Sequence, residues 1–233
     1  MNRFLYTGES NESLAMCVNG DGTRFIARAA AEVGAKLVYY STDYVFDGTK
    51  ETSYIESDQT GPATVYGKSK LAGEEAVRDE TENHIIMRIA WVYGAHGNNF
   101  VKTMLRLGRE QLEARALGKR IIPLKVVDDQ IGNPTWTEQT VEQTKLLLEA
   151  NRSGLFHATS EKPSSWYQFA SDIFRLKQLE VELEPCTSEQ FPRPAPRPRM
   201  SALENDRLNQ LGLNRMRQYI EDLEQFFKMY PEL

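Results

Sequence analysis

Apolar residues along the chain follow two patterns, a helical spacing and short continuous runs. The helical spacing covers residues 12–33, 63–79, 98–107, about 137–150, 164–176 and 215–230, and it predicts amphipathic helices. The runs at 36–40, 85–92 and 155–158 are almost entirely apolar, which is typical of strands buried on both faces of a parallel sheet. Because strands and helices alternate, the sequence predicts parallel strand–helix–strand units with right-handed crossovers.

This alternation indicates an α/β fold with a Rossmann-like parallel sheet, helices on both of its faces, and a small mixed α/β lobe. We expect residues 1–97 to hold a cofactor-binding and catalytic domain and residues 98–233 to form mainly a substrate-binding lobe. The helix near 137–150 is expected to pack back on the sheet. In open parallel sheets, ligands bind at the carboxyl ends of the strands, so the segment after the 36–40 strand is the first place to look for chemistry.

Composition narrows the class of protein. Of the 233 residues, 40% are hydrophobic and 26% are charged, and the net charge is −5, which is ordinary for a globular protein and gives no basic field for nucleic acid. The two cysteines lie far apart, the three histidines are isolated, and no apolar run is long enough to span a bilayer. We therefore predict a cytoplasmic protein with no metal site, no nucleic-acid partner and no membrane partner. A homodimer is compatible with these observations.

A candidate catalytic pair lies at the start of the 63–79 helix. Tyr66 and Lys70 are four residues apart, so both side chains project from one helical face. A nearby ammonium favours the phenolate and is expected to lower the tyrosine pKa from its ordinary value near 10. A hydroxyl from Ser41 or Thr42, at the end of the preceding strand, could hold a carbonyl oxygen beside the tyrosine. These groups would suffice to protonate a carbonyl oxygen while another group delivers hydride.

Other interpretations of the same residues stay open. A tyrosine and a lysine four apart occur by chance on many solvated helix faces. Gly20 and Gly22 interrupt the 12–33 helix, which indicates close approach either by a neighbouring element or by a ligand.

Longer motifs give a resemblance. The chain reads STDYVFDG at 41–48 and VYGKSKLAGE at 65–74, followed by WVYG at 91–94, NNFV at 98–101, VDDQ at 127–130 and GNPT at 132–135. Taken in this order, the motifs resemble the extended short-chain dehydrogenase/reductase family, and within it the branch that reduces dTDP-4-dehydrorhamnose. The resemblance runs from about residue 12 to the end of the chain.

The resemblance implies an oxidoreductase that uses NADPH or NADH to reduce the 4-keto group of dTDP-4-dehydro-L-rhamnose, giving dTDP-L-rhamnose for surface polysaccharides. By motif position, Tyr66 would donate the proton, Lys70 would hold the nicotinamide ribose, and Thr42 would bind the substrate carbonyl. Ser41 and Asn19 are further candidates for cofactor contacts. The candidates for substrate contacts besides Thr42 are Tyr44, Trp91, Asn99 and Arg199.

One part of the family pattern is missing. Members begin with a glycine-rich turn that cradles the cofactor pyrophosphate, and the sequence has neither Gly-x-Gly-x-x-Gly nor its three-gap variant. We therefore expect a chain that lacks the first strands of the sheet, through a misassigned start, a truncation or a natural short form. Two other functions share the fold: a nucleotide-sugar epimerase or dehydratase, and a non-catalytic regulatory subunit or scaffold like that of methionine adenosyltransferase.

Overall fold

A three-stranded parallel sheet lies at the centre of the fold. The computed structural model describes residues 9–190 and 197–233. Strands β1 (Leu37–Thr42), β2 (His84–Ile89) and β7 (Gly154–His157) run parallel in the order β1-β2-β7. The register places Leu37 beside His84 and Ile85 beside Gly154, so all three carboxyl ends lie at one edge. The middle strand is buried on both faces, as its apolar run predicts.

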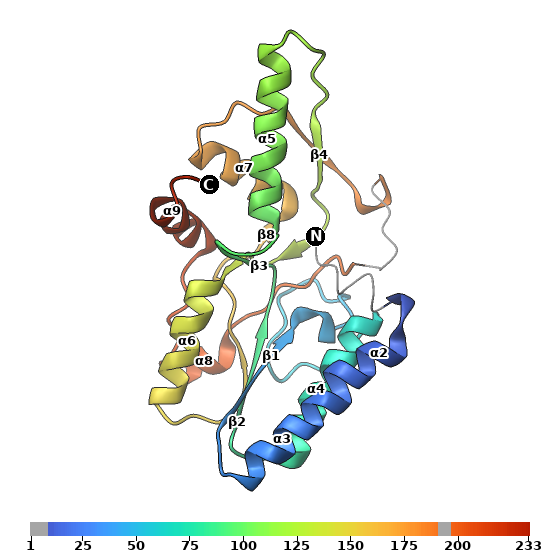
Figure 1. Ribbon diagram of the computed structural model, residues 1–233, viewed down its shortest axis with the longest axis vertical. Coiled ribbons are helices and arrows are strands. Elements are labelled where there is room, and N and C mark those ends of the chain that lie inside the picture. Colours follow the sequence, from blue (N-terminus) through green and yellow to red (C-terminus); the bar gives the residue numbers. More distant parts are fainter. Residues whose placement is uncertain (1–8, 191–196) are drawn as a thin grey trace.

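Helices cover both faces of this sheet. On one face, α4 (Val65–Glu80) lies alongside α2 (Glu12–Met16) and α3 (Gly22–Glu32), which follow each other end to end (Figure 1), and Ala27 and Val77 pack on Ile86. On the other face, α6 (Thr137–Glu149) and α8 (Asp206–Gln210) contribute Leu147 and Leu208 to a core that includes Met87 and Phe156. The predicted Rossmann-like arrangement is confirmed.

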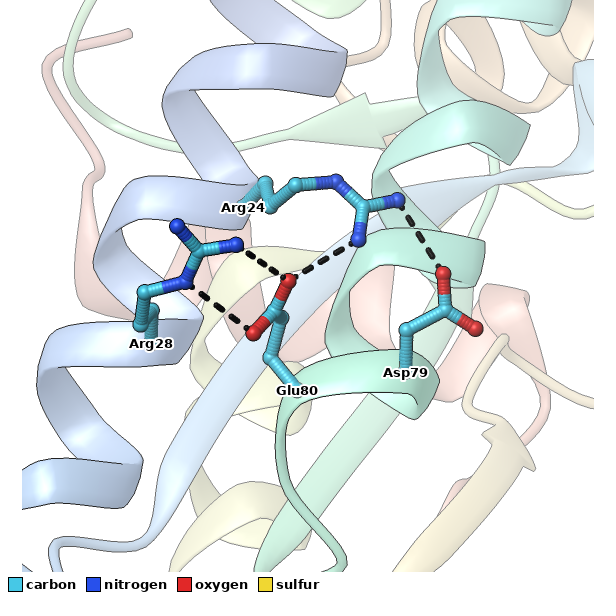
Figure 2. A network of polar contacts seen from close by, with 4 residues as sticks. All are labelled: Arg24, Arg28, Asp79 and Glu80. Carbon is cyan, nitrogen blue, oxygen red and sulfur yellow. Dashed lines mark hydrogen bonds and ion pairs between the residues drawn. The ribbon is translucent and has the colours of Figure 1, made fainter.

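The short π-helical segment η1 (Cys17–Asp21) joins α2 to α3 in one continuous helical stretch. This stretch packs on α4, where an added Cβ on Gly20 would meet Ala72 at an ordinary 3.4 Å. Gly20 therefore faces a neighbouring helix, whereas Gly22 faces the Cys17 carbonyl of its own stretch. Arg24 and Arg28 of α3 also form ion pairs with Asp79 and Glu80 of α4 across the surface of the two helices (Figure 2).

The lobe is built around a second, aromatic-rich core. Helices α5 (Phe100–Ala116), α7 (Trp166–Leu176) and α9 (Tyr219–Met229) pack beside the parallel pair β4 (Leu124–Val127) and β9 (Leu183–Cys186). Two short pairs lie where the lobe meets the sheet: β3 (Val92–Tyr93) with β6 (Thr135–Trp136), and β5 (Ile131–Gly132) with β8 (Ser164–Ser165). In Figure 1, α5 and β4 extend furthest from the central sheet. Within the described ranges, no helix is both long enough and apolar enough to cross a membrane.

The structure differs from the sequence prediction at two element boundaries. Helix α5 continues to Ala116 instead of ending near 107; beyond Gly108 only Gln111 of this helix is buried, so its second half carries no apolar stripe. Strand β2 ends at Ile89 instead of 92 because Trp91 takes a left-handed backbone conformation with φ of 47°.

Candidate active site

Thr42 and Tyr66 come together at the carboxyl edge of the sheet. Thr42 is the last residue of β1, and its Oγ1 accepts a hydrogen bond from the amide of Tyr44 at 3.3 Å, at the start of the 3₁₀ helix η2 (Asp43–Val45). Tyr66 lies in the first turn of α4, which Thr64 caps by accepting from the amide of Gly67 at 3.0 Å. An added Cβ on Gly67 would lie 2.1 Å from the Tyr44 carbonyl oxygen. The glycine therefore lets the start of α4 press against η2, which holds Tyr66 near Thr42.

The environment of Tyr66 keeps its phenol protonated. Burial raises its pKa to about 12, the Asp43 carboxylate adds to the rise, and a hydrogen bond with Thr42 acts in the opposite direction. The expectation that Lys70 lowers this pKa is therefore not met in the structure. The physical reason is that burial dominates this pKa and the Lys70 ammonium is not among the groups that act on it. The Tyr66 phenol is therefore protonated at neutral pH.

Lys70 lies one helical turn after Tyr66. Its Nζ is 4.0 Å from the centroid of the Tyr39 ring, a cation–π contact. Burial lowers its pKa to about 8, and the Glu74 carboxylate opposes this shift. Within the described ranges its ammonium makes no ion pair, so its hydrogen-bond donors are free of carboxylate partners. Such an ammonium suits the hydroxyls of a ribose.

Asp43 is a buried carboxyl group that sequence reasoning did not place in the site. Its Oδ1 accepts a hydrogen bond from Thr42 Oγ1 at 2.9 Å, and burial raises its pKa to about 6. It also acts on the pKa of Tyr66. Its position directly after Thr42, at the end of a buried parallel strand, was the available signal.

Tyr44 joins this group from the loop side. Its ring centroid lies 5.9 Å from that of Tyr66, with the rings nearly perpendicular. Beside it is a cavity of about 80 Å³, lined by Tyr44, Phe46, Asp47, Ala63, Thr64, Arg197 and Pro198. The cavity is small, but it opens the site toward the 197–200 segment.

Trp91 is held in place by the lobe. Its ring stacks on Trp166, with centroids 3.5 Å apart and planes 6° apart. Gly132 packs against the same ring, since an added Cβ there would lie 2.3 Å from it. A bulky residue with positive φ costs free energy, and such conformations cluster at ligand sites. Trp91 therefore stands fixed at the end of β2, between sheet and lobe.

Two candidate cofactor residues use their side chains inside the protein. The Ser41 hydroxyl donates to Glu74 Oε1 at 2.5 Å, because successive side chains of a strand point to opposite faces and Ser41 faces α4. The Asn19 amide donates to Ser69 Oγ at 3.0 Å and fastens η1 to α4. The structure thus gives both residues contacts within the fold.

Two candidate substrate residues, Asn99 and Arg199, also have contacts within the protein. Asn99 is 7% exposed; its amide nitrogen donates to the Gly94 carbonyl at 2.7 Å and its oxygen caps the amide of Lys102 at 3.1 Å. This places it as the N-cap of α5. Arg199 is exposed, and its carbonyl accepts from the amide of Ile131 at 2.8 Å. Its guanidinium lies near Asp129, whose pKa it helps to lower.

Comparison with known proteins adds to this geometry. The family described as the RmlD substrate binding domain matches residues 5–231. The chain is 40% identical over 223 residues to a dTDP-4-keto-6-deoxy-D-glucose reductase of Streptomyces niveus, covering 95% of this chain and 74% of the relative. It is also 40% identical over 226 residues to a dTDP-4-dehydrorhamnose reductase of Streptomyces griseus, covering 94% and 71%.

A solved structure is similar over the whole described fold. The dTDP-4-dehydrorhamnose reductase of Bacillus anthracis, in complex with NADP, superposes with a TM-score of 0.90 at 36% identity. The likeness covers 98% of this chain and 78% of that one.

Proposed function

The chain belongs to the RmlD substrate binding domain family, and from this premise we propose that it reduces the 4-keto group of a dTDP-linked deoxysugar with NADPH or NADH. The observation that carries the proposal is the contact between Thr42 and Tyr66 at the carboxyl edge of the parallel sheet, with Lys70 one turn further along α4. This edge is where open α/β sheets bind their ligands.

Each of these side chains has a defined task. Tyr66, protonated at neutral pH, donates its phenolic proton to the 4-keto oxygen as negative charge develops there. Thr42, within reach of the same phenol, would turn its one hydroxyl hydrogen from Asp43 Oδ1 to that oxygen when the substrate binds, and so orient the carbonyl. The Lys70 ammonium adds positive charge to the site, which favours the anionic oxygen in the transition state.

The cofactor would be held at its nicotinamide end by this chain's own residues. Lys70 and Tyr66 would hydrogen-bond the ribose hydroxyls, and the absence of an ion pair to Lys70 within the described ranges leaves its ammonium able to do so. When bound, NADPH or NADH supplies the hydride that the carbonyl carbon accepts. The described residues contain no glycine-rich turn between a strand and a helix, so no pyrophosphate contact is assigned to them.

We propose dTDP-4-dehydro-L-rhamnose as the substrate and dTDP-L-rhamnose as the product. The Streptomyces griseus relative, a dTDP-4-dehydrorhamnose reductase, supports this choice, while the Streptomyces niveus relative is named for a different dTDP-linked 4-keto sugar. Tyr44 and Trp91 are the proposed substrate contacts, since Tyr44 packs edge-on against Tyr66 and Trp91 follows the carboxyl end of β2, where Ile89 pairs with Thr42. Asn99 and Arg199 are secondary candidates, because one caps α5 and the other lies exposed near Asp129. The lobe built by α5, α7 and α9 is proposed to hold the sugar nucleotide against the sheet edge.

A non-catalytic scaffold of the same fold is the second candidate. A scaffold needs the apolar core but has no use for a half-buried phenol, a half-buried lysine that forms no ion pair within the described ranges, and a strained tryptophan at one sheet edge. The presence of all three favours the reductase.

Substitution of Tyr66 by phenylalanine tests the proposal. Tyr66→Phe removes the proton donor and leaves the ring, so we expect NADPH oxidation with the keto-sugar nucleotide to fall by about 10² to 10⁴-fold, with an unchanged circular-dichroism spectrum. Tyr40→Phe is the matched control, because it removes a hydroxyl that, among the described residues, forms its hydrogen bond with Thr144, at 2.8 Å. Undiminished turnover by Tyr66→Phe would contradict the assignment of Tyr66 as the donor.

A further inference from the structure

A buried ion pair lies beneath the proposed catalytic residues. Glu74 of α4 accepts from Arg88 of β2 through both oxygens, with Nε–Oε1 and Nη2–Oε2 distances of 2.8 Å. The two side chains are 0% and 2% exposed. Burying two charges is costly unless their geometry is good and their hydrogen bonds are made. Apolar residues could fill the same space, so the pair calls for a role besides packing.

The Glu74 carboxylate joins three elements of the fold. Its ion pair with Arg88 links α4 to β2. The hydrogen bond that it accepts from the Ser41 hydroxyl, at 2.5 Å, links α4 to β1. Ser41 is bonded covalently to Thr42, the residue proposed to hold the substrate carbonyl. The distance between β1 and α4 at this level is therefore fixed by one carboxylate.

The same carboxylate lies in line with the catalytic helix face. Lys70 is four residues before Glu74, and Tyr66 is eight before it, so the three side chains follow one face of α4. A rotation or shift of α4 would move Tyr66 and Lys70 together relative to Thr42. Arg88 extends the network further, because its guanidinium lies 4.9 Å from the centroid of the Phe46 ring, just after η2.

From this geometry we propose that Glu74 is a positioning residue for the reduction: with Arg88 and Ser41 it holds Thr42 of β1 in register with Tyr66 and Lys70 of α4. The inference rests on the proposed function. It assigns no contact with substrate or cofactor to Glu74, and it gives the Ser41 hydroxyl a task in place of the expected cofactor contact. The negative charge of Glu74 also supports Lys70 as a cation, because it opposes the effect of burial on the Lys70 pKa.

Two variants separate positioning from plain stability. Glu74→Gln alone leaves the Arg88 charge buried and unpaired, so it can fail through misfolding. The double variant Glu74→Gln/Arg88→Met removes both charges and keeps the volume of the site filled. Ser41→Ala leaves the ion pair intact and removes only the link to β1. Both are assayed in the full chain, well below their melting temperatures, for NADPH oxidation with the keto-sugar nucleotide.

We expect kcat to fall about a hundredfold in the double variant, the usual cost of displacing reacting groups by an ångström, and to fall less in Ser41→Ala. KM for the keto-sugar should change little, since the lobe that binds the sugar is untouched. In the double variant the basic limb of the pH profile should move to lower pH, because Lys70 loses the carboxylate that raises its pKa.

Glu80→Gln on the same helix is the control. Glu80 pairs with Arg24 and Arg28 on the surface of α3 and α4 (Figure 2), so its loss should leave kcat and the pH profile unchanged. A folded double variant with wild-type kcat and an unshifted pH limb would overturn the inference. A wild-type chain that binds NADPH but never reduces the sugar would instead count against the proposed function. In that case the Lys70 pKa, read by NMR of ¹³C-methylated lysines in wild type and double variant, still tests the action of Glu74 on Lys70.

Discussion

At the scale of single residues, burial shifts the pKa values of Tyr66 and Lys70 in opposite directions. Tyr66 keeps its proton up to a pKa of about 12, while Lys70 loses its proton near 8. Both shifts have desolvation as their largest cause, and desolvation disfavours the charged form of each group. A reduction needs the phenol neutral and the ammonium charged, so both conditions hold together only below a pH of about 8.

The pH dependence of turnover should therefore show a basic limb set by Lys70. We expect kcat/KM for reduction to fall above pH 8, because Lys70 then becomes neutral while Tyr66 stays protonated. The measurement is NADPH oxidation between pH 6 and 10. Lys70→Arg, whose guanidinium stays charged over this range, should lower the rate and remove the limb; a limb that persists in this variant would assign it to another group.

The sequence predicted part of the site at this scale. The spacing of Tyr66 and Lys70 and the strand end at Thr42 were visible because they depend on local geometry alone. The roles of Ser41 and Asn99 were not, since a hydroxyl or an amide near a sheet edge can serve a ligand or a neighbouring element. The role of Glu74 depends on Arg88, 14 residues along the chain, and cannot be inferred from local spacing. The position of Asp43 directly after Thr42 was visible in the sequence, but its depth of burial was not.

At the scale of elements, the contact between the first helical stretch and α4 positions the catalytic helix. An added Cβ on Gly73 would lie 2.2 Å from the Tyr39 hydroxyl and 2.5 Å from the Asn19 carbonyl. The Tyr39 hydroxyl also donates to the Lys70 carbonyl at 3.1 Å. Tyr39 and the π-helical segment therefore both contact α4 closely at Gly73.

Substitution of Gly73 by alanine should destabilise the fold. Overpacking of a close contact costs about 1–3 kcal/mol, and this exceeds the gain of up to about 1 kcal/mol from higher helix propensity. Urea denaturation followed by circular dichroism measures the difference. Gly20→Ala is the comparison, because its Cβ would meet Ala72 at an ordinary 3.4 Å; equal losses in the two variants would show that the contact at Gly73 is not close.

Apolar periodicity predicted the elements of the sheet well and those of the lobe less well. All three runs became strands of the sheet, but only β2 is buried on both faces. The expected burial of the 36–40 run on both faces was wrong, because β1 is an outer strand of the described sheet and Tyr40 is 39% exposed. The second half of α5 and the short helix α8 escaped prediction because few of their side chains face a core. Burial in the lobe comes largely from aromatic contacts between elements distant in sequence, such as Tyr93 with Phe226.

At the scale of the whole molecule, the chain passes repeatedly between sheet and lobe. After β2 it builds α5 and β4 in the lobe, returns for α6 and β7 on the sheet, then enters the lobe again for α7 and β9. The pairs β3–β6 and β5–β8 link these passages. Neither the sheet with its helices nor the lobe is one continuous segment of the chain. We therefore expect the unfolding of one to be coupled to the unfolding of the other.

Thermal unfolding should therefore be a single transition. The three tryptophans, Trp91, Trp136 and Trp166, lie in the lobe or at its junction with the sheet, whereas far-ultraviolet circular dichroism reports all helices. We expect the two signals to give the same midpoint, the usual sign of two-state behaviour. A lower midpoint by tryptophan fluorescence would indicate a lobe that unfolds independently.

The same interleaving restricts how such an enzyme can change its preferred sugar over evolutionary time. Because α6 and β7 are encoded between the segments that build the lobe, one recombination event cannot transplant the lobe from a relative without also replacing a strand and a helix of the sheet. A new specificity would have to arise by point substitutions, or by insertions in loops between elements. A chimaera of two relatives with a single crossover between the first and last lobe segments would therefore have a sheet core built from both parents.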